Sequence, residues 1–358
     1  MNIDSGIESI LHQIQAARQS RTPLRIRAGG SKDFYGQSLQ GEILDVSGYR
    51  GIISYEPAEL VIRVRAGTPL YEIEAALAEH HQFLGFEPPH FKRATIGGIV
   101  ATGLAGPRRA SVGAVRDFVL GARLIDGRSQ HLSFGGSVMK NVAGYDVSRL
   151  LVGSLGILGV ITEVSLKVLP RPFQERTLQF EMNEQQAITV LNEWGGLALP
   201  LSASLWYDNV LSVRLSGVPV AIEAACLRLG GCVLNAVVGH QLWESVREQT
   251  HEFFTQRQSA QVLMRLSLPS TTPTLSLPGS CLVEWGGAQR WFIAKNIEEI
   301  RATQALALQA GGYATRFCGT GGEFMSPLHP VKEQIHRQLK KEFDPQHLFN
   351  RGRMFATF

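Results

Sequence analysis

The sequence predicts an α+β protein of two domains, in which a glycine-rich first domain precedes a smaller α+β domain with an antiparallel sheet. Three observations support this prediction. The chain has 358 residues, of which 44% are hydrophobic, so it is long and apolar enough to form two cores. Short strand-like segments alternate with amphipathic helical segments along the chain. Glycine-rich loops become rare after Pro172, so we place the domains at residues 1–172 and 173–358.

The first domain begins with a predicted amphipathic helix over residues 3–17, where isoleucine and leucine recur at helical spacing. A second helix is predicted over residues 68–81, with Thr68 as its N-cap and Pro69 at its first position. An Asp-Gly pair at 126–127 predicts the turn of a hairpin. Strands are predicted within the ranges 23–28, 42–46, 60–67, 118–134 and 156–172.

The second domain alternates helices and strands in two stretches of similar length. Helices are predicted over residues 184–196 and 221–231, and strands over 211–217 and 232–239. We therefore expect one sheet with its helices on a single face, built from a duplicated unit. The chain closes with a predicted helix over residues 330–343 and a tail.

Composition excludes several classes of protein. The net charge is +4, and the 35 basic residues are scattered rather than gathered in a stripe, so we expect no nucleic-acid partner. The four cysteines lack the spacing of a zinc or iron–sulfur site and suit a reducing compartment. The longest apolar run, residues 150–161, contains three glycines and is too short to span a bilayer. The N-terminus does not resemble a signal peptide, so we expect a cytoplasmic protein whose membrane contact is only indirect.

Three glycine-rich segments are candidates for ligand binding, at residues 29–36, 94–117 and 140–164. None has the spacing of a Rossmann fingerprint or of a P-loop. Glycine allows positive φ and the close approach of a ligand, and successive N–H groups in such loops suit a pyrophosphate. Taken alone, the first segment is more typical of an ordinary tight turn, and Arg108 and Arg109 are typical of a solvated turn. Together, three separated loops suit a ligand as long as FAD.

The order of these motifs resembles the FAD-binding domain of the vanillyl-alcohol-oxidase, or PCMH-type, flavoproteins. The resemblance covers roughly residues 1–172. It is carried by IRAGGSKDFYG (26–36), PPHFKRATIGGIVATGLAGPRRASVGAVRD (88–117), VLGARLIDG (119–127), MKNVAGYD (139–146) and GSLGILG (153–159).

Within that family, the chain is most similar to the small FAD-binding subunits of bacterial glycolate oxidases. This closer resemblance rests on PRRASVGAVRD, MKNVAGYD and GSLGILG taken together. The ending EFDPQHLFNRGRM (342–354) is also similar to the DP-x-x-x-x-N-x-G-[KR] tail of the family.

The resemblance implies which residues bind FAD. The loop at 28–33 would hold the pyrophosphate, and Pro88 would lie near the ring. The segment 95–103 would run past the ribityl chain and the ring, with Ser111 and Gly113 closing the loop. Ile161 would contact the adenine end through its backbone. The complete set is Ala28, Gly29, Gly30, Ser31, Lys32, Asp33, Pro88, Thr95, Gly97, Gly98, Ala101, Thr102, Gly103, Ser111, Gly113 and Ile161.

The sequence departs from the family in three places. Residues 28–36 contain no histidine, where many relatives attach the flavin covalently, so we expect non-covalent FAD. The loop at 154–159 is less polar than in the larger relatives that oxidise 2-hydroxy acids. The second domain lacks the His-x-Gly-Asp-Gly-Asn-x-His motif with which those relatives hold a metal, so we predict no metal site. His329 and His336 would lie about 10.5 Å apart along a helix, too far to share one ion.

The resemblance implies an FAD-binding subunit of a glycolate oxidase complex that converts glycolate to glyoxylate. Its partners would be a larger FAD-containing subunit and an iron–sulfur subunit that passes electrons onward, with the complex peripheral at the inner membrane. The chain alone is expected to be inactive, and its catalytic residues are unknown. Two alternatives stay open: a free-standing FAD-dependent dehydrogenase of another 2-hydroxy acid or alcohol, and a non-catalytic assembly subunit. The intact glycine loops argue against an assembly subunit that has lost its flavin.

Overall fold

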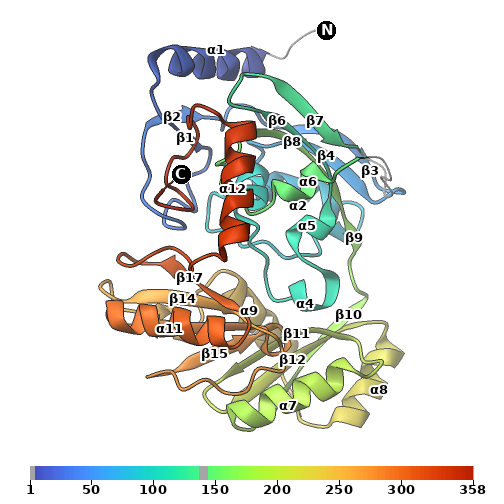
Figure 1. The fold of residues 1–358 in the computed structure, drawn as a ribbon. Coiled ribbons are helices and arrows are strands. Elements are labelled where there is room, and N and C mark those ends of the chain that lie inside the picture. Colours follow the sequence, from blue (N-terminus) through green and yellow to red (C-terminus); the bar gives the residue numbers. More distant parts are fainter. Residues whose placement is uncertain (1–4, 137–143, 358) are drawn as a thin grey trace. The chain divides into compact units, whose positions relative to one another are not determined.

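The computed structural model of the chain describes residues 5–136 and 144–357 (Figure 1). These residues divide into two compact units. The first unit contains the segments up to Leu104, 114–170 and from Pro327 onward, and the second contains 105–113 and 171–326.

This division differs from the expected one at two segments. The expected boundary after residue 172 lies beside Pro170, where the middle segment of the first unit ends. Residues from Pro327 onward, which we assigned to the second domain, belong to the first unit, and residues 105–113 belong to the second. The C-terminal segment joins the first unit because Leu348 and Phe349 are fully buried in its core.

The first unit contains a five-stranded antiparallel sheet with the strand order β3-β4-β8-β6-β7. The central strand β8 is buried along nearly its whole length, as expected for a strand that is covered on both faces. The predicted hairpin is confirmed: β6 and β7 pair across Asp126, whose Oδ1 accepts hydrogen bonds from the N–H groups of Arg128 and Gln130. The bounds are β3 Ile52–Glu56, β4 Val61–Arg65, β6 Val119–Ile125, β7 His131–Gly135 and β8 Val160–Lys167.

In a smaller layer of the first unit, the N-terminal segment packs against the C-terminal tail. Strands β1 and β2 pair in parallel (Figure 1). Phe349 from the tail forms a β-bridge with Leu24 of β1. Ile10 and Ile14 of helix α1 pack into the same core as Phe349. The helices predicted at both ends of the chain are confirmed. The bounds are α1 Ser5–Ser20, β1 Leu24–Arg27, β2 Glu42–Asp45 and α12 Pro330–Phe343.

Short elements complete the first unit. The predicted N-cap of the second helix is wrong by one residue, because the helix has Pro69 as its N-cap. The Thr68 hydroxyl instead accepts a hydrogen bond from Gly51 N at 2.8 Å and donates one to Arg65 O at 2.6 Å. The bounds are α2 Leu70–Ala78, β5 Gln82–Phe83, α3 Ile96–Thr102, α5 Val115–Phe118, α6 Val147–Leu150 and β9 Leu169–Pro170.

The second unit is built on an eight-stranded sheet in which all neighbouring strands are antiparallel, as predicted. Its order is β13-β10-β12-β11-β15-β16-β14-β17. The sheet has two halves, β10–β13 and β14–β17, which meet at β11 and β15. Counted from its outer edge inward, each half places its own strands in the order fourth, first, third, second. This repeated topology supports the expected duplication. The bounds are β10 Gln174–Glu181, β11 Leu201–Tyr207, β12 Val210–Gly217, β13 Cys232–Val233, β14 Val262–Ser267, β15 Cys281–Glu284, β16 Gln289–Ala294 and β17 Tyr313–Cys318.

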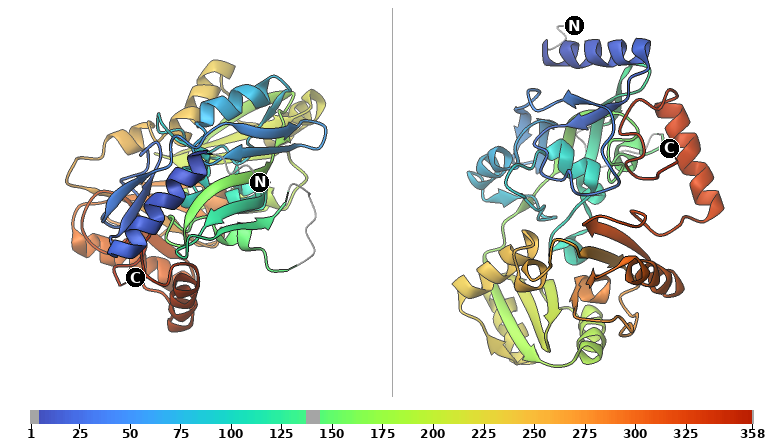
Figure 2. Two further views of the ribbon diagram at one scale, coloured as in Figure 1. Left: turned by 90° about the horizontal axis from the view of Figure 1, so that it is seen from above. Right: turned by 90° about the vertical axis from the view of Figure 1, so that its left-hand side faces the viewer.

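Helices cover both faces of this sheet, so the expectation of a single covered face is wrong. Leu178 of β10 packs with Ala187 of α7 and Ile222 of α8. The adjacent Thr177 points to the other face, where its Oγ1 accepts a hydrogen bond from Nε1 of Trp243 in α9 at 2.9 Å. The helices can be followed in both views of Figure 2. The bounds are α4 Arg109–Val112, α7 Glu184–Gly195, α8 Pro219–Leu229, α9 Ala236–Arg247, α10 Glu252–Thr255 and α11 Ile297–Gln309.

The strand predicted over residues 232–239 is only two residues long, because a helix starts within that range. Asn235 is the N-cap of α9, and its side chain accepts a hydrogen bond from Val237 N at 2.9 Å. The apolar residues after Asn235 fitted either a strand or a helix, and the cap decides in favour of the helix.

A carboxyl group is buried in the second unit. Glu284 of β15 is 3% exposed, and its Oε2 accepts hydrogen bonds from Trp291 Nε1 at 2.6 Å and Gln289 Nε2 at 3.0 Å. Burial raises the pKa of Glu284 to about 7, although the two hydrogen bonds and the nearby Arg265 lower it. The folded protein therefore binds this proton more tightly than the unfolded chain does.

The stability of the second unit should depend on pH through Glu284. The pKa is 4.5 in the unfolded chain and about 7 in the folded one, so the stabilisation is complete below pH 4.5 and is lost as pH rises through 7. The loss should approach about 3 kcal/mol. Glu284→Gln, which keeps an acceptor for Trp291, should lack this part of the pH dependence. Urea unfolding at about pH 5 and about pH 8 measures the difference, and parallel profiles in both proteins would contradict the assignment.

Candidate functional site

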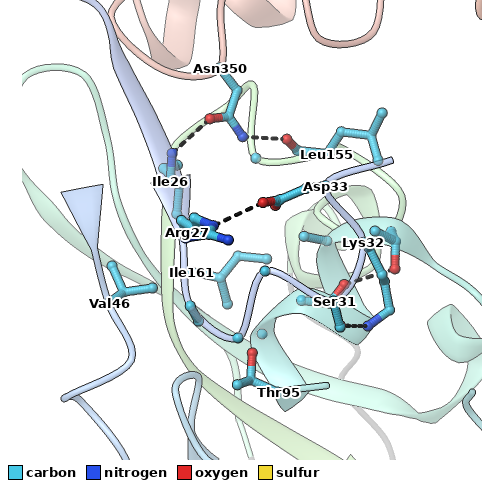
Figure 3. A pocket seen from close by; sticks show the side chains of 18 of the residues that line it. Ile26, Arg27, Ser31, Lys32, Asp33, Val46, Thr95, Leu155, Ile161 and Asn350 are labelled. Atoms are coloured by element: carbon cyan, nitrogen blue, oxygen red, sulfur yellow. Dashed lines mark hydrogen bonds and ion pairs between the residues drawn. The ribbon is translucent and has the colours of Figure 1, made fainter. Parts of the chain in front are cut away.

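The first unit contains a pocket that is bounded by its glycine-rich loops (Figure 3). It brings together segments that lie far apart in the sequence: the loop after β1, helix α3, the loop before β8 and the C-terminal tail. The predicted site residues that line it are Ala28, Gly29, Gly30, Ser31, Lys32, Asp33, Thr95, Gly97, Gly98, Ala101, Thr102 and Ile161.

The first wall of the pocket is the loop at residues 28–33. Gly30 has φ +66°, a conformation that glycine adopts without steric cost and that turns the chain out of β1. Lys32 is 8% exposed, and its ammonium group donates to Ser31 Oγ at 3.0 Å. Arg27 Nε pairs with Asp33 Oδ2 at 2.9 Å across the loop. The loop therefore presents main chain and a cation to the pocket.

Helix α3 forms the second wall, and its two glycines serve different purposes. A Cβ atom on Gly97 would lie 2.7 Å from the Cβ of Ala66, so this glycine is required by packing within the protein. A Cβ on Gly98 would find only the Thr95 hydroxyl, at 3.4 Å, within 4 Å. Because Gly98 lines the pocket, a side chain there would occupy space that a ligand needs.

The first two N–H groups of α3 are bonded within the protein. That of Ile96 donates to Thr68 O at 3.0 Å, and that of Gly97 donates to Ala66 O at 2.8 Å, so these two groups do not face a ligand. The Thr102 hydroxyl donates to Gly98 O at 2.7 Å, so it can offer only its lone pairs to a ligand.

The C-terminal tail forms a wall that sequence reasoning missed. Asn350 and Arg353 line the pocket, although more than three hundred residues separate them from the first loop. Both belong to the N-x-G-[KR] part of the family-like tail, which is the one sequence signal that could have identified them. Leu155 and Gly156 of the GSLGILG segment also line the pocket.

The charge of the pocket suits a pyrophosphate. Its lining includes three basic side chains, Arg27, Lys32 and Arg353, and one acidic side chain, Asp33. The resulting charge of +2 balances the roughly two negative charges of a dinucleotide pyrophosphate. The remaining lining is mainly backbone and apolar, as expected where a ligand also has flat aromatic parts.

Four predicted residues do not line this pocket: Pro88, Gly103, Ser111 and Gly113. Gly103 ends α3 with φ +64°, and a Cβ atom there would lie 3.3 Å from Gly153. Ser111 and Gly113 belong to the second unit, where the Ser111 hydroxyl lies 3.4 Å from Ser202 O. Most of the MKNVAGYD motif, from residue 139 to 143, lies outside the described residues.

The two adjacent arginines do not form a solvated turn. Arg108 is 6% exposed and forms an ion pair with Glu175 within the second unit. Arg109 lies over the ring of Trp285, with its guanidinium carbon 4.4 Å from the ring centroid. Both side chains anchor the segment 105–113 to the sheet of the second unit, so the turn interpretation is wrong.

Three of the histidines have local structural partners. His90 Nε2 lies 2.9 Å from a carboxylate oxygen of Glu74. His329 is the N-cap of α12, and His336 Nδ1 lies 2.7 Å from Lys332 O. Among the residues that the structure describes, no group of three or more His, Cys, Asp or Glu side chains is arranged to hold a metal ion.

The fold and the pocket define the first unit as a flavin-binding domain. Residues 6–135 match the family described as "FAD binding domain", which confirms the predicted cofactor, FAD. The whole chain is 48% identical to glycolate oxidase subunit GlcE of Escherichia coli (strain K12), over 98% of this chain and 97% of that protein. The chain therefore belongs to the family of glycolate oxidase GlcE subunits.

More distant relatives confirm the fold class. Glycolate oxidase subunit GlcD of Bacillus subtilis (strain 168) is 25% identical, over 85% of this chain and 77% of that protein. The structure of p-cresol methylhydroxylase with substrate bound superposes with a TM-score of 0.71 at 12% identity, covering 98% of this chain and 88% of that one. Alkyldihydroxyacetonephosphate synthase gives a TM-score of 0.67 at 14% identity, covering 96% and 75%. The PCMH-type fold with its second α+β domain is confirmed.

The two glycines of α3 should respond differently to alanine. Gly98→Ala should leave the apoprotein as stable as before, or more stable by up to about 1 kcal/mol, because alanine favours a helix. It should weaken FAD binding more than about tenfold, because the methyl group enters the pocket. Gly97→Ala should destabilise the apoprotein by about 1–3 kcal/mol through its clash with Ala66. Thermal unfolding and FAD titration measure both effects, and a Gly98→Ala protein with wild-type affinity would show that no ligand lies there.

Proposed function

We propose that this chain is the FAD-binding subunit of a glycolate oxidase complex, which oxidises glycolate to glyoxylate and passes two electrons onward. The single observation that carries the proposal is the 48% identity to a GlcE subunit over nearly the full length of both chains. When bound, FAD supplies the two-electron redox chemistry. The contribution of this chain is to bind, orient and shield the cofactor.

The pocket supports specific roles for its residues. The loop at 28–33 would hold the pyrophosphate, since it combines glycine backbone with the buried Lys32. Gly98, Ala101 and Thr102 would lie along the rest of the cofactor as one side of α3. Ile161, at the start of β8, would lie at the adenine end. Because the first loop contains no histidine, we propose that FAD is held without a covalent bond.

We further propose two partner subunits, a larger FAD-containing subunit and an iron–sulfur subunit. The similarity of the chain to both a GlcE and a GlcD subunit supports an assembly of related flavoproteins. A separate iron–sulfur subunit is consistent with the lack of cluster spacing among the four cysteines of this sequence.

Among the described residues, no helix combines the length and the apolar character needed to cross a bilayer. Contact with the inner membrane, as part of this proposal, would be made through the complex.

A flavin-free assembly subunit is a poorer account of the same observations. Such a subunit would have no reason to keep an open position at Gly98, where a Cβ atom meets only one hydroxyl group. It would also have no reason to keep a net charge of +2 in a largely apolar pocket. Both features serve a ligand, so the pocket favours a flavin-loaded subunit.

The flavin should be released by denaturation. After precipitation of the loaded protein with acid, all of the yellow colour should stay in the supernatant and should have the mass of FAD. The physical reason is that the proposed contacts are hydrogen bonds and charge attraction, which end when the loops unfold. Colour retained in the pellet would contradict non-covalent binding.

The isolated, FAD-loaded chain should not oxidise glycolate at an appreciable rate. A 2-hydroxy acid must have its carboxylate fixed before reaction, and positioning of this kind contributes about 7–11 kcal/mol in favourable cases. The second domain lacks the motif with which larger relatives fix the carboxylate. Dye reduction by the chain alone should therefore be negligible, whereas the assembled complex should turn over glycolate. Equal rates would support the free-standing enzyme instead.

A further inference from the structure

Asn350 connects two walls of the cofactor pocket. Its side-chain oxygen accepts a hydrogen bond from Ile26 N at 2.8 Å, and its Nδ2 donates to Leu155 O at 2.6 Å (Figure 3). Gly156 permits this approach, because a Cβ atom there would lie 2.7 Å from Asn350 Nδ2. One buried amide therefore sets the separation between β1, which leads into the first loop, and the segment before β8.

Arg353 holds the first loop through main-chain carbonyl groups. Its Nη2 donates to Lys32 O at 3.1 Å and to Asp33 O at 2.9 Å, and its Nη1 donates to Gln37 O at 2.6 Å. The side chain is 6% exposed and lines the pocket. Because C=O and N–H point in opposite directions across a trans peptide, a guanidinium that fixes these carbonyls also fixes the orientation of the peptide planes between them.

We propose that Asn350 and Arg353 are positioning residues of the FAD site, which hold the loops in the binding geometry before FAD arrives. This proposal rests on the proposed function. The two residues lie three positions apart in the tail, on either side of Arg351 and Gly352. They act by preorganisation, since a loop that is already ordered loses less conformational entropy on binding.

The surrounding core makes this arrangement rigid. Leu24 N donates to Leu348 O at 2.7 Å and Asn350 N donates to Leu24 O at 2.8 Å, so the tail lies beside β1 like a further strand. Phe349 is fully buried between these contacts. Asn350 thus enters the pocket from a fixed main chain, which explains how a residue at the end of the chain acts at a loop near its start.

Affinity and stability separate a positioning role from a merely structural one. We would measure the FAD dissociation constant by flavin fluorescence and the melting temperature of the apoprotein for Asn350→Ala, Asn350→Asp and Arg353→Lys. Asn350→Asp keeps an acceptor for Ile26 and loses the donor to Leu155. Arg353→Lys keeps the charge and loses the fork that holds several carbonyls. The matched control is Arg351→Ala, because Arg351 lies between the two and bonds only His347 O, at 3.1 Å, among the contacts described.

Each of the three variants should raise the dissociation constant about tenfold or more, with the control within about twofold of wild type. Hydrogen exchange of residues 28–37 in the apoprotein should also be faster in Arg353→Lys than in wild type. Lower melting temperatures with unchanged FAD affinity would overturn the proposal and leave the two residues a structural role. Wild-type protein that binds no FAD would overturn the proposed function as well, so the two failures are distinguishable.

Discussion

The buried ion pair between Lys340 and Asp344 is the constraint on which the pocket of the first unit depends. Both side chains are completely buried, and Lys340 Nζ lies 2.7 Å from Asp344 Oδ2. The ammonium group also donates to Ile157 O at 2.7 Å and Phe349 O at 2.9 Å, which uses all three of its donors. Burial lowers the pKa of Lys340, and the Asp344 carboxylate opposes that effect.

Charged side chains that are buried this deeply are stable only when they are paired and all their hydrogen bonds are formed. The ion pair therefore fixes the positions of the groups that bond to it. Asp344 also accepts hydrogen bonds from Leu348 N at 2.9 Å and Phe349 N at 2.8 Å, which starts the tail in the direction of β1. Gly127 of the hairpin turn lies against the same carboxylate, where a Cβ atom would come within 2.6 Å of Oδ1. The end of α12, the hairpin turn and the segment before β8 therefore meet at one point.

Much of the fold was predictable from local patterns. The helices at both ends, the hairpin at Asp126 and the first loop after β1 follow from spacing, turn chemistry and glycine content. The resemblance to a known family supplied the cofactor and most of the residues that line the pocket. These features depend on short stretches of sequence, which is why local patterns predict them.

The features that were missed depend on contacts between distant segments. Nothing near Asn350 indicates that its amide bridges Ile26 and Leu155, because both partners are main-chain groups far away in the sequence. The burial of Arg108 likewise depends on Glu175, which lies 67 positions along the chain. The expectation of a single covered face for the second sheet failed for a related reason. A polar residue such as Thr177 next to Leu178 is typical of a face that meets solvent, and only the contact with Trp243 of α9 shows that this face is covered as well.

A structure of the chain with FAD bound would show directly whether the pocket of the first unit is the flavin site. We expect one FAD per chain in this pocket. Its pyrophosphate should lie against the loop at residues 28–33, and the rest of the molecule should follow the Gly98 side of α3. Clear density for FAD at another site, or no FAD in this pocket at saturating concentration, would contradict this expectation.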